Sequence, residues 1–442
     1  MTASSFDISE FIDSRPVGAS QLRILATCFV VMLLDGFDMQ IIGLVVPALA
    51  SAWGLTPQDL GLALTAGPVG MVIGAASLGP VADRYGRKWP VVAAVTVFGM
   101  FTLLAASVQT PTALALLRFL MGIGLGGVIP NVVALSAEYV PVRSRATFST
   151  LAYTGVPLGA LASGLVGTWL IPSAGWQSVF YVGGLVPLAI AAYAALALPE
   201  SLRFVAARAE RSGEAAAIIR RIAPEVQLPA SVQFTLREAA QKRTGVAALF
   251  GPGRTVPTIL LTLVFVANTF GVYFFMSWLP VLMKQSGLSL RFSLLSTVLL
   301  NGGGAVGTAA LGLLIDRLGI FRVMTASYFV GGLAISAVGL GGGPALLVPA
   351  IFLSGTCMMG AQCAMYAAVA LVYPTAIRAT GVGTTMGWGR LGSIIGPAIG
   401  TVFVALQWPI AMDFFAASLP IFAAALFIYT VGRIPRNFER PT

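Results

Sequence analysis

Twelve long apolar runs divide this chain, and they constrain its fold more than any other feature. A helix of about 20 residues crosses the roughly 30 Å hydrocarbon core of a bilayer. The runs cover approximately residues 24–50, 60–82, 89–109, 112–138, 146–171, 177–198, 255–283, 292–315, 321–341, 344–371, 379–406 and 409–432. Only 10% of the residues are charged, against about a quarter in soluble domains. We therefore predict an all-α membrane protein with twelve transmembrane helices.

The two halves of the chain repeat at a constant offset of 233 residues. The loop "GPVADRYGRK" recurs as "GLLIDRLGIF", and "PVRSRAT" recurs as "PTAIRAT". The matching positions include Gly79 and Gly312, Asp83 and Asp316, Arg84 and Arg317, and Arg145 and Arg378. One offset across separate motifs predicts two six-helix halves in the same orientation, which form parallel repeats. In such folds the substrate site lies near the midplane between the halves, so the repeat predicts a transporter.

Basic residues predict the orientation of the bundle. The side that carries both termini holds 22 of the 26 Lys and Arg, so the positive-inside rule places both termini in the cytoplasm. The net charge of +10 is therefore explained by topology and by attraction to anionic lipid, and a nucleic-acid partner is not expected.

The same reading gives the domain organisation. We divide the chain into a cytoplasmic segment at 1–23, a six-helix half at 24–198, a cytoplasmic linker at 199–254, a second six-helix half at 255–432 and a cytoplasmic tail at 433–442. The linker begins "SLRFVAARAERSGEAAAIIRRIAP", with an apolar face at helical spacing. We expect one surface helix there, ending at Pro224 and lying under the bundle.

Charged residues inside the predicted helices are the candidate functional groups, because intramembrane ionisable residues usually mark substrate or ion pathways. Asp35 lies near the midplane, and Asp38 follows one turn later, so both can face one cavity. Asp35 corresponds through the repeat to Asn268. Arg390 lies at a similar depth, and Arg118 lies nearer the outer end. The alternative is that Asp–Arg pairs only join helices.

Proton coupling in this chain would have to use carboxylates, since it contains no histidine and Lys and Arg titrate at high pH. Asp35 and Asp38 are the candidates, and the sequence leaves open which of them carries the proton. A substrate anion that binds a nearby arginine would free an aspartate to take up a proton.

Residues near the helix ends on the terminus side are candidate gating residues. The repeated G-x3-D-R-x2-G loops allow ion pairs that form in one orientation of a carrier and break in the other, although they can also simply stabilise the loops. Glu138 is either a gate or a local bridge to Arg143 or Arg145. The candidate gating residues are Gly79, Asp83, Arg84, Glu138, Arg145, Asp316 and Arg378.

Metal, disulfide and enzyme chemistry are not expected. Cys28, Cys357 and Cys363 all lie in apolar stretches without metal-ligand spacing. Nothing resembles a set of nucleophile and base. We predict no cofactor.

Several motifs resemble those of the major facilitator superfamily: "GPVADRYGRK", the R-x3-G-x-G-x-G-G run at residues 118–127, and "LPES" at 198–201. Within it, "LLDGFDMQIIG", "GVIPNVVALSAEY" and "YPTAIRATGVGTTMGWGRLGSIIGP" resemble the aromatic acid:proton symporters. The resemblance covers essentially the whole chain. It implies proton-coupled uptake of a small aromatic carboxylate, such as benzoate or a hydroxybenzoate, across the bacterial inner membrane. We expect a monomer.

The resemblance also implies roles for individual residues. Asp35 and Asp38 would act in uptake and proton coupling, Asp83 in conformational change, and Arg390 would bind the substrate carboxylate. Separately from the resemblance, Phe270, Tyr273, Phe274 and Tyr366 are candidates to stack on the ring, and the alternative for each is packing or a lipid-facing position. The candidate substrate-binding residues are Arg390, Asn268, Arg118, Tyr273 and Tyr366.

Other functions fit the sequence less well. Proton-driven efflux remains the alternative, but "GVPLGALASG" lacks the Gly-Pro pair of the antiporter-type fifth helix. Sugar porters carry a "QQ…GxN…YY" pattern where this chain reads "VANTFGVYFFMSWLP". A membrane sensor would need an appended signalling domain, which the short linker does not provide.

Overall fold

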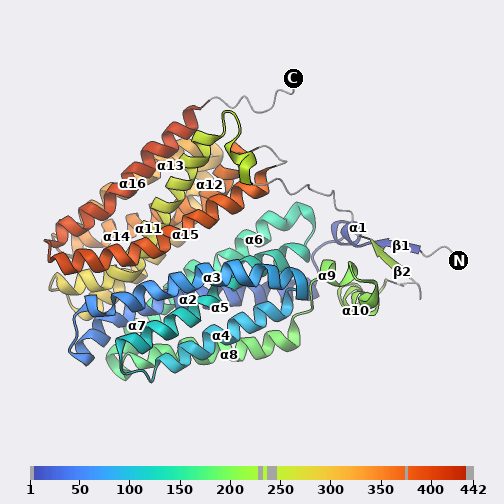
Figure 1. Cartoon of the computed structure of the whole chain (residues 1–442), viewed down its shortest axis with the longest axis horizontal. Coiled ribbons are helices and arrows are strands. Elements are labelled where there is room, and N and C mark those ends of the chain that lie inside the picture. The colour runs from blue at the N-terminus through green and yellow to red at the C-terminus, as the bar shows by residue number, and fades with distance from the viewer. Residues whose placement is uncertain (1–3, 227–231, 236–245, 374–376, 435–442) are drawn as a thin grey trace.

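The computed structural model describes residues 4–226, 232–235, 246–373 and 377–434, and it is almost entirely helical (Figure 1). Within that part of the chain, twelve helical spans are long and apolar enough to cross a membrane. The first half contains α2 (Ala19–Trp53), α3 (Gly61–Tyr85), α4 (Lys88–Ala105), α5 (Pro111–Glu138), α6 (Arg145–Tyr153) with α7 (Gly155–Ala174), and α8 (Gln177–Ala197). The second half contains α11 (Thr255–Gln285), α12 (Leu290–Leu318), α13 (Ile320–Gly339), α14 (Pro344–Val372), α15 (Arg378–Leu406) and α16 (Ile410–Arg433). The predicted fold class is confirmed.

The outer faces of these helices are apolar. Leu196 is 86% exposed, Leu340 is 76% exposed and Trp169 is 74% exposed. Apolar surface of this extent would drive aggregation in water, whereas in a bilayer it faces acyl chains. The chain is therefore a multi-pass membrane protein.

The two halves repeat each other in their packing. In the first half α3 packs on α5, α4 on α8 and α2 on α7; in the second, α12 packs on α14, α13 on α16 and α11 on α15. A Cβ on Gly70 would collide with the backbone carbonyl of Phe119, and a Cβ on Gly303 would collide with that of Phe352. Three further pairs of such glycines are Gly74 and Gly307, Gly122 and Gly355, and Gly159 and Gly392. All are 233 residues apart, so the repeat extends to the backbone contacts that small residues permit.

The halves touch at one end of the bundle and diverge toward the end that carries the termini (Figure 1). We call these the closed end and the open end. At the closed end, Gly43 of α2 packs against the backbone of Met276 in α11, and Gly61 faces Thr401 of α15. Gln40 donates a hydrogen bond from Nε2 to the Met276 carbonyl oxygen (2.9 Å). These contacts hold the two halves together at the closed end.

A small sheet at the open end was not predicted. Strand β1 (Ser4–Asp7) pairs in parallel with β2 (Val232–Thr235) of the linker. Helix α1 (Ile8–Asp13) follows β1 directly. Arg15 forms an ion pair with Glu225, so the N-terminal segment is fastened to the linker.

The prediction of one continuous linker helix was wrong. The chain forms α9 (Leu202–Ala206), a 3-10 turn at Ala209–Arg211 and α10 (Ser212–Ile222), and a further 3-10 turn at Val246–Phe250 precedes α11. Arg208 and Arg211 both stack on the Phe204 ring, at 3.6 and 5.4 Å from its centroid. This double contact bends the chain between α9 and α10. The apolar face identified in the sequence is nevertheless the buried face of α10, at Ala215, Ile218 and Ile219.

A matched pair of substitutions in α12 tests the packing role of the repeated glycines. We expect Gly303→Ala to destabilise the protein by about 1–3 kcal/mol, because the added methyl group overpacks the α12–α14 contact. Gly312→Ala is the control: nothing lies within 4 Å of its Cβ position, and alanine is the better helix former by about 1 kcal/mol. Thermal unfolding in detergent measures both. Equal stability of the two variants would contradict the packing account.

Candidate functional site

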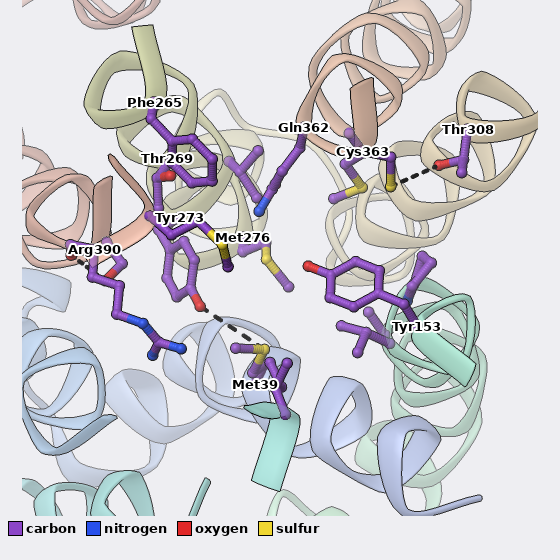
Figure 2. A pocket seen from close by; sticks show the side chains of 18 of the residues that line it. Met39, Tyr153, Phe265, Thr269, Tyr273, Met276, Thr308, Gln362, Cys363 and Arg390 are labelled. Atoms are coloured by element: carbon purple, nitrogen blue, oxygen red, sulfur yellow. Dashed lines mark hydrogen bonds between the residues drawn. The ribbon is translucent and has the colours of Figure 1, made fainter. Parts of the chain in front are cut away.

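A cavity of about 120 Å³ lies between the two halves, and both halves contribute to its wall (Figure 2). An apolar cavity of about 150 Å³ is enough to hold benzene, so this one matches a ligand of single-ring size. Its wall is largely apolar. Five methionines contribute to it: Met39, Met71, Met276, Met359 and Met386. Methionine side chains are flexible and make favourable contacts with aromatic rings.

Arg390 of α15 provides the charge of the cavity. Among the described residues that line the cavity, it alone is charged. Tyr273 of α11 interacts electrostatically with Arg390, and both side chains lie on the same side of the cavity (Figure 2). A cation in a small apolar space between two halves favours an anionic ligand, because the surroundings screen charge poorly.

Asp35 lies close to Arg390 but does not line the cavity. It is fully buried, and neither of its carboxylate oxygens has a hydrogen-bond partner in the part of the chain that the structure describes. It lies within electrostatic range of both Arg390 and Asp38. Met39, one helical turn further along α2, is part of the cavity wall. A carboxylate buried without a hydrogen bond is costly to ionise, so the ionised form of Asp35 depends on the nearby arginine.

Asp38, in contrast, has two partners. Its Oδ2 lies 3.3 Å from Nη1 of Arg118, and Thr102 donates a hydrogen bond to Oδ1 at 2.6 Å. These three residues are buried and join α2, α5 and α4. Gly67 of α3 leaves space for the arginine, since a Cβ there would lie 3.1 Å from Nη2 of Arg118. Asp38 and Arg118 thus form an Asp–Arg pair that joins helices, the alternative given in the sequence analysis, and neither residue is part of the lining of this cavity.

The other predicted binding residues divide into two groups. Tyr273 and Tyr366 line the cavity. Asn268 does not, although it is buried and both its amide atoms lack hydrogen-bond partners among the described residues. Phe270 and Phe274 stack on each other, with centroids 6.0 Å apart, and also lie outside the lining.

Sequence reasoning missed several polar residues of the lining. Tyr153 of α6 approaches Tyr366 across the two halves, with ring centroids 6.2 Å apart. Thr269 is buried and its hydroxyl lacks a partner. Gln362 of α14 also lines the cavity. For Gln362 a signal was available, because it is an amide in the middle of a long apolar run.

Glu138 and the "LPES" motif form a polar network at the open end, within the first half. Glu138 pairs with Arg87, with Oε1 and Nε 2.8 Å apart, and accepts a hydrogen bond from Ser201. Glu200 accepts from the backbone N–H groups of Arg87 (2.6 Å) and Lys88 (3.1 Å). In the second half, the positions equivalent to Arg87 and Glu138 are occupied by Ile320 and Leu371. The corresponding ion pair therefore cannot form there.

The partner predicted for Glu138 was therefore wrong. Arg143 instead donates to the backbone carbonyl oxygens of Asp13 and Arg15, because the N-terminal segment folds over that loop. Arg145 is half-buried.

The remaining gating candidates whose side chains the structure describes make few contacts. Arg84 is exposed and stacks on Tyr85, and Asp316 is exposed. Gly79 has nothing within 4 Å of its Cβ position. The side chains of Asp83 and Arg378 lie outside the described part of the structure.

A membrane bundle of two repeated halves that diverge toward one end, with a central cavity between them, is the architecture of an alternating-access transporter. The family model described as Major Facilitator Superfamily matches residues 28–397. The chain belongs to the major facilitator superfamily, as its motifs predicted, and therefore to a family of transporters and not of enzymes.

Relatives and a solved structure agree with this assignment. The chain is 39% identical to the gallate transporter of Pseudomonas putida, over 96% of this chain and 95% of the relative. It is 37% identical to the 4-hydroxybenzoate transporter PcaK of Pseudomonas aeruginosa, over 97% of this chain and 96% of the relative. The crystal structure of a D-xylose-proton symporter is similar in fold, with a TM-score of 0.73 at 16% identity, over 95% of this chain and 99% of that one.

A double-mutant experiment tests whether Asp38 and Arg118 act as a structural pair. We expect Arg118→Leu to destabilise the protein by about 3–5 kcal/mol, because it leaves a buried carboxylate without its cation. Adding Asp38→Asn should restore much of this loss, since the unpaired charge disappears. Thermal unfolding in detergent gives all three values. Additive losses in the double variant would show that the two side chains do not depend on each other.

Proposed function

We propose that this protein carries out proton-coupled uptake of a small aromatic carboxylate, of the benzoate or hydroxybenzoate class, across a bacterial inner membrane. The observation that carries the proposal is a single cation, Arg390, in a methionine-lined cavity of single-ring size, with the unpartnered Asp35 nearby. The printed functions of the gallate and 4-hydroxybenzoate relatives support the same substrate class.

Arg390 would bind the carboxylate of the substrate. A guanidinium presents two parallel N–H donors to a carboxylate, and the surrounding wall excludes competing water. Tyr273, Tyr366 and the methionines would contact the ring through aromatic and sulfur contacts. Asn268 and Arg118, which lie outside the lining, would act on the substrate only through their neighbours.

Proton coupling follows from the charges around Arg390. In the empty carrier the arginine compensates the ionised Asp35. When the substrate carboxylate binds the arginine, two anions share one cation, and the buried Asp35 has no hydrogen bond to stabilise its charge. Taking up a proton at Asp35 restores the original charge. We assign the transported proton to Asp35, and assign Asp38 to the pair that holds Arg118 in place.

Transport would then proceed by rocking of the two halves about the cavity. With both termini in the cytoplasm, the open end described here would face inward. Opening to the outside would break the Gln40–Met276 contact at the closed end. It would also bring together the open-end loops that carry Asp83, Asp316 and Arg378, which we propose as gating residues together with Gly79, Arg84, Glu138 and Arg145.

Uptake by reconstituted liposomes tests this proposal. With an inward proton gradient, we expect wild type to accumulate radiolabelled 4-hydroxybenzoate or gallate. Arg390→Ala should lose transport and binding, and Arg390→Lys should retain a fraction of both because the charge remains without the two-pronged geometry. Asp35→Asn should lose gradient-driven accumulation but retain exchange of internal for external substrate.

Two results would contradict the proposal. Failure of the wild type to move any member of a panel of aryl carboxylates would reject the substrate class. Gradient-driven accumulation at the wild-type level by Asp35→Asn would reject Asp35 as the coupling residue. Met71→Leu, in the cavity wall, is the control for a change that removes no charge.

A further inference from the structure

The cavity has two chemically different sides. Arg390 and Tyr273 lie on one side, whereas Tyr153 and Cys363 lie on the other, and the amide end of Gln362 points into the cavity between Tyr273 and Tyr153 (Figure 2). A carboxylate held by Arg390 therefore directs the far edge of its ring toward the side of Gln362 and Tyr153.

Gln362 is a polar group in the path of that ring edge, and the fold does not explain its chemistry. It makes no hydrogen bond or ion pair with the rest of the described chain. Its neighbours on the same helix are different: Ser354 and Thr356 donate to the carbonyl oxygens of Ala350 and Phe352 at 2.8 and 2.9 Å. An amide in an apolar wall loses free energy unless it is hydrogen-bonded, so a ligand group is the natural partner for Gln362.

We propose that Gln362 recognises a ring hydroxyl on the side of the substrate remote from the carboxylate. This inference rests on the proposed function and narrows it to benzoates hydroxylated at the 4- position or at the adjacent positions. A carboxamide both donates and accepts hydrogen bonds, so it suits a phenol, which does the same. The Tyr153 hydroxyl faces the same part of the cavity (Figure 2) and is placed to contact a second, neighbouring hydroxyl.

The five methionines of the cavity wall determine affinity for the ring itself, independently of its hydroxyl groups. Methionines contact a ring without directional hydrogen bonds and adapt to its shape. They therefore contribute affinity for any single-ring acid but do not distinguish one hydroxylation pattern from another. Discrimination comes from Gln362, because a site built to bond a hydroxyl leaves its own polar group unpaired when the hydroxyl is missing.

Competition against uptake of labelled 4-hydroxybenzoate tests the inference in the wild type. We expect benzoate to compete about tenfold more weakly than 4-hydroxybenzoate, by the usual cost of an unpaired amide. 2-Hydroxybenzoate, whose hydroxyl lies beside the carboxylate, should behave like benzoate. Equal competition by the 2- and 4-hydroxy acids would overturn the proposal without any variant.

Gln362→Met assigns the effect to the residue, because methionine keeps the length of the side chain and removes the amide. The preference for 4-hydroxybenzoate over benzoate should fall about tenfold, with benzoate affinity little changed. Met359→Leu, one turn earlier on the same cavity wall, should leave the preference intact. An equal loss of affinity for 4-hydroxybenzoate and benzoate, or an unchanged preference for 4-hydroxybenzoate, would overturn the role of Gln362.

The outcomes separate this inference from the function on which it rests. If wild type carries no aromatic acid, the proposed function fails. If wild type carries them but Gln362→Met keeps the wild-type preference, transport stands and only the hydroxyl recognition fails.

Discussion

The positive charge of Arg390 is the constraint on which the rest of the site depends. It lies in a small apolar cavity in the middle of a membrane bundle, where a charge without a counter-ion is expensive. Two anions are available to it: Asp35 of the opposite half and the carboxylate of a bound substrate. Because one cation can compensate only one of them fully, the proposed function links binding of the substrate to protonation of the aspartate. In this proposal the linkage lies at the interface between the halves, where their relative movement would change access to the cavity.

The two aspartates of the first long helix, Asp35 and Asp38, are distinguished by their interaction partners and not by their depth in the membrane. Asp38 has a cation and a hydroxyl of its own half, so its charge is compensated whether or not substrate is present. Asp35 has neither, and depends on a residue of the other half. A rigid first half supports this division, since the glycine contacts that recur at an offset of 233 residues fix the helix pairs within each half. The repeated scaffold is therefore symmetric in packing and asymmetric in charge.

The sequence predicted the fold because the determinants of the fold are local or periodic. Apolar runs gave the twelve spans, and one constant offset gave the two halves. Side-chain partners were harder to predict. Asp38 and Arg118 are 80 positions apart in the sequence. Nothing in this spacing distinguishes an arginine that would bind substrate from one that binds an aspartate. Glu138 was predicted to be either a gate or a local bridge to Arg143 or Arg145, but it pairs with Arg87, which precedes α4 and is distant in the sequence. Linker bending by Arg208 and Arg211 on Phe204, and pairing of β1 with β2, also depend on tertiary contacts that no periodicity reveals.

The central claim is that substrate and proton compete through Arg390 and Asp35, and proton uptake on binding measures this directly. Purified protein in weakly buffered detergent solution would be mixed with 4-hydroxybenzoate adjusted to the same pH, and the change in pH recorded with the amount of substrate bound. The account predicts that wild type takes up protons in proportion to bound substrate, and that Asp35→Asn binds substrate without proton uptake. Binding by the wild type with no change in pH, or undiminished proton uptake by Asp35→Asn, would contradict it.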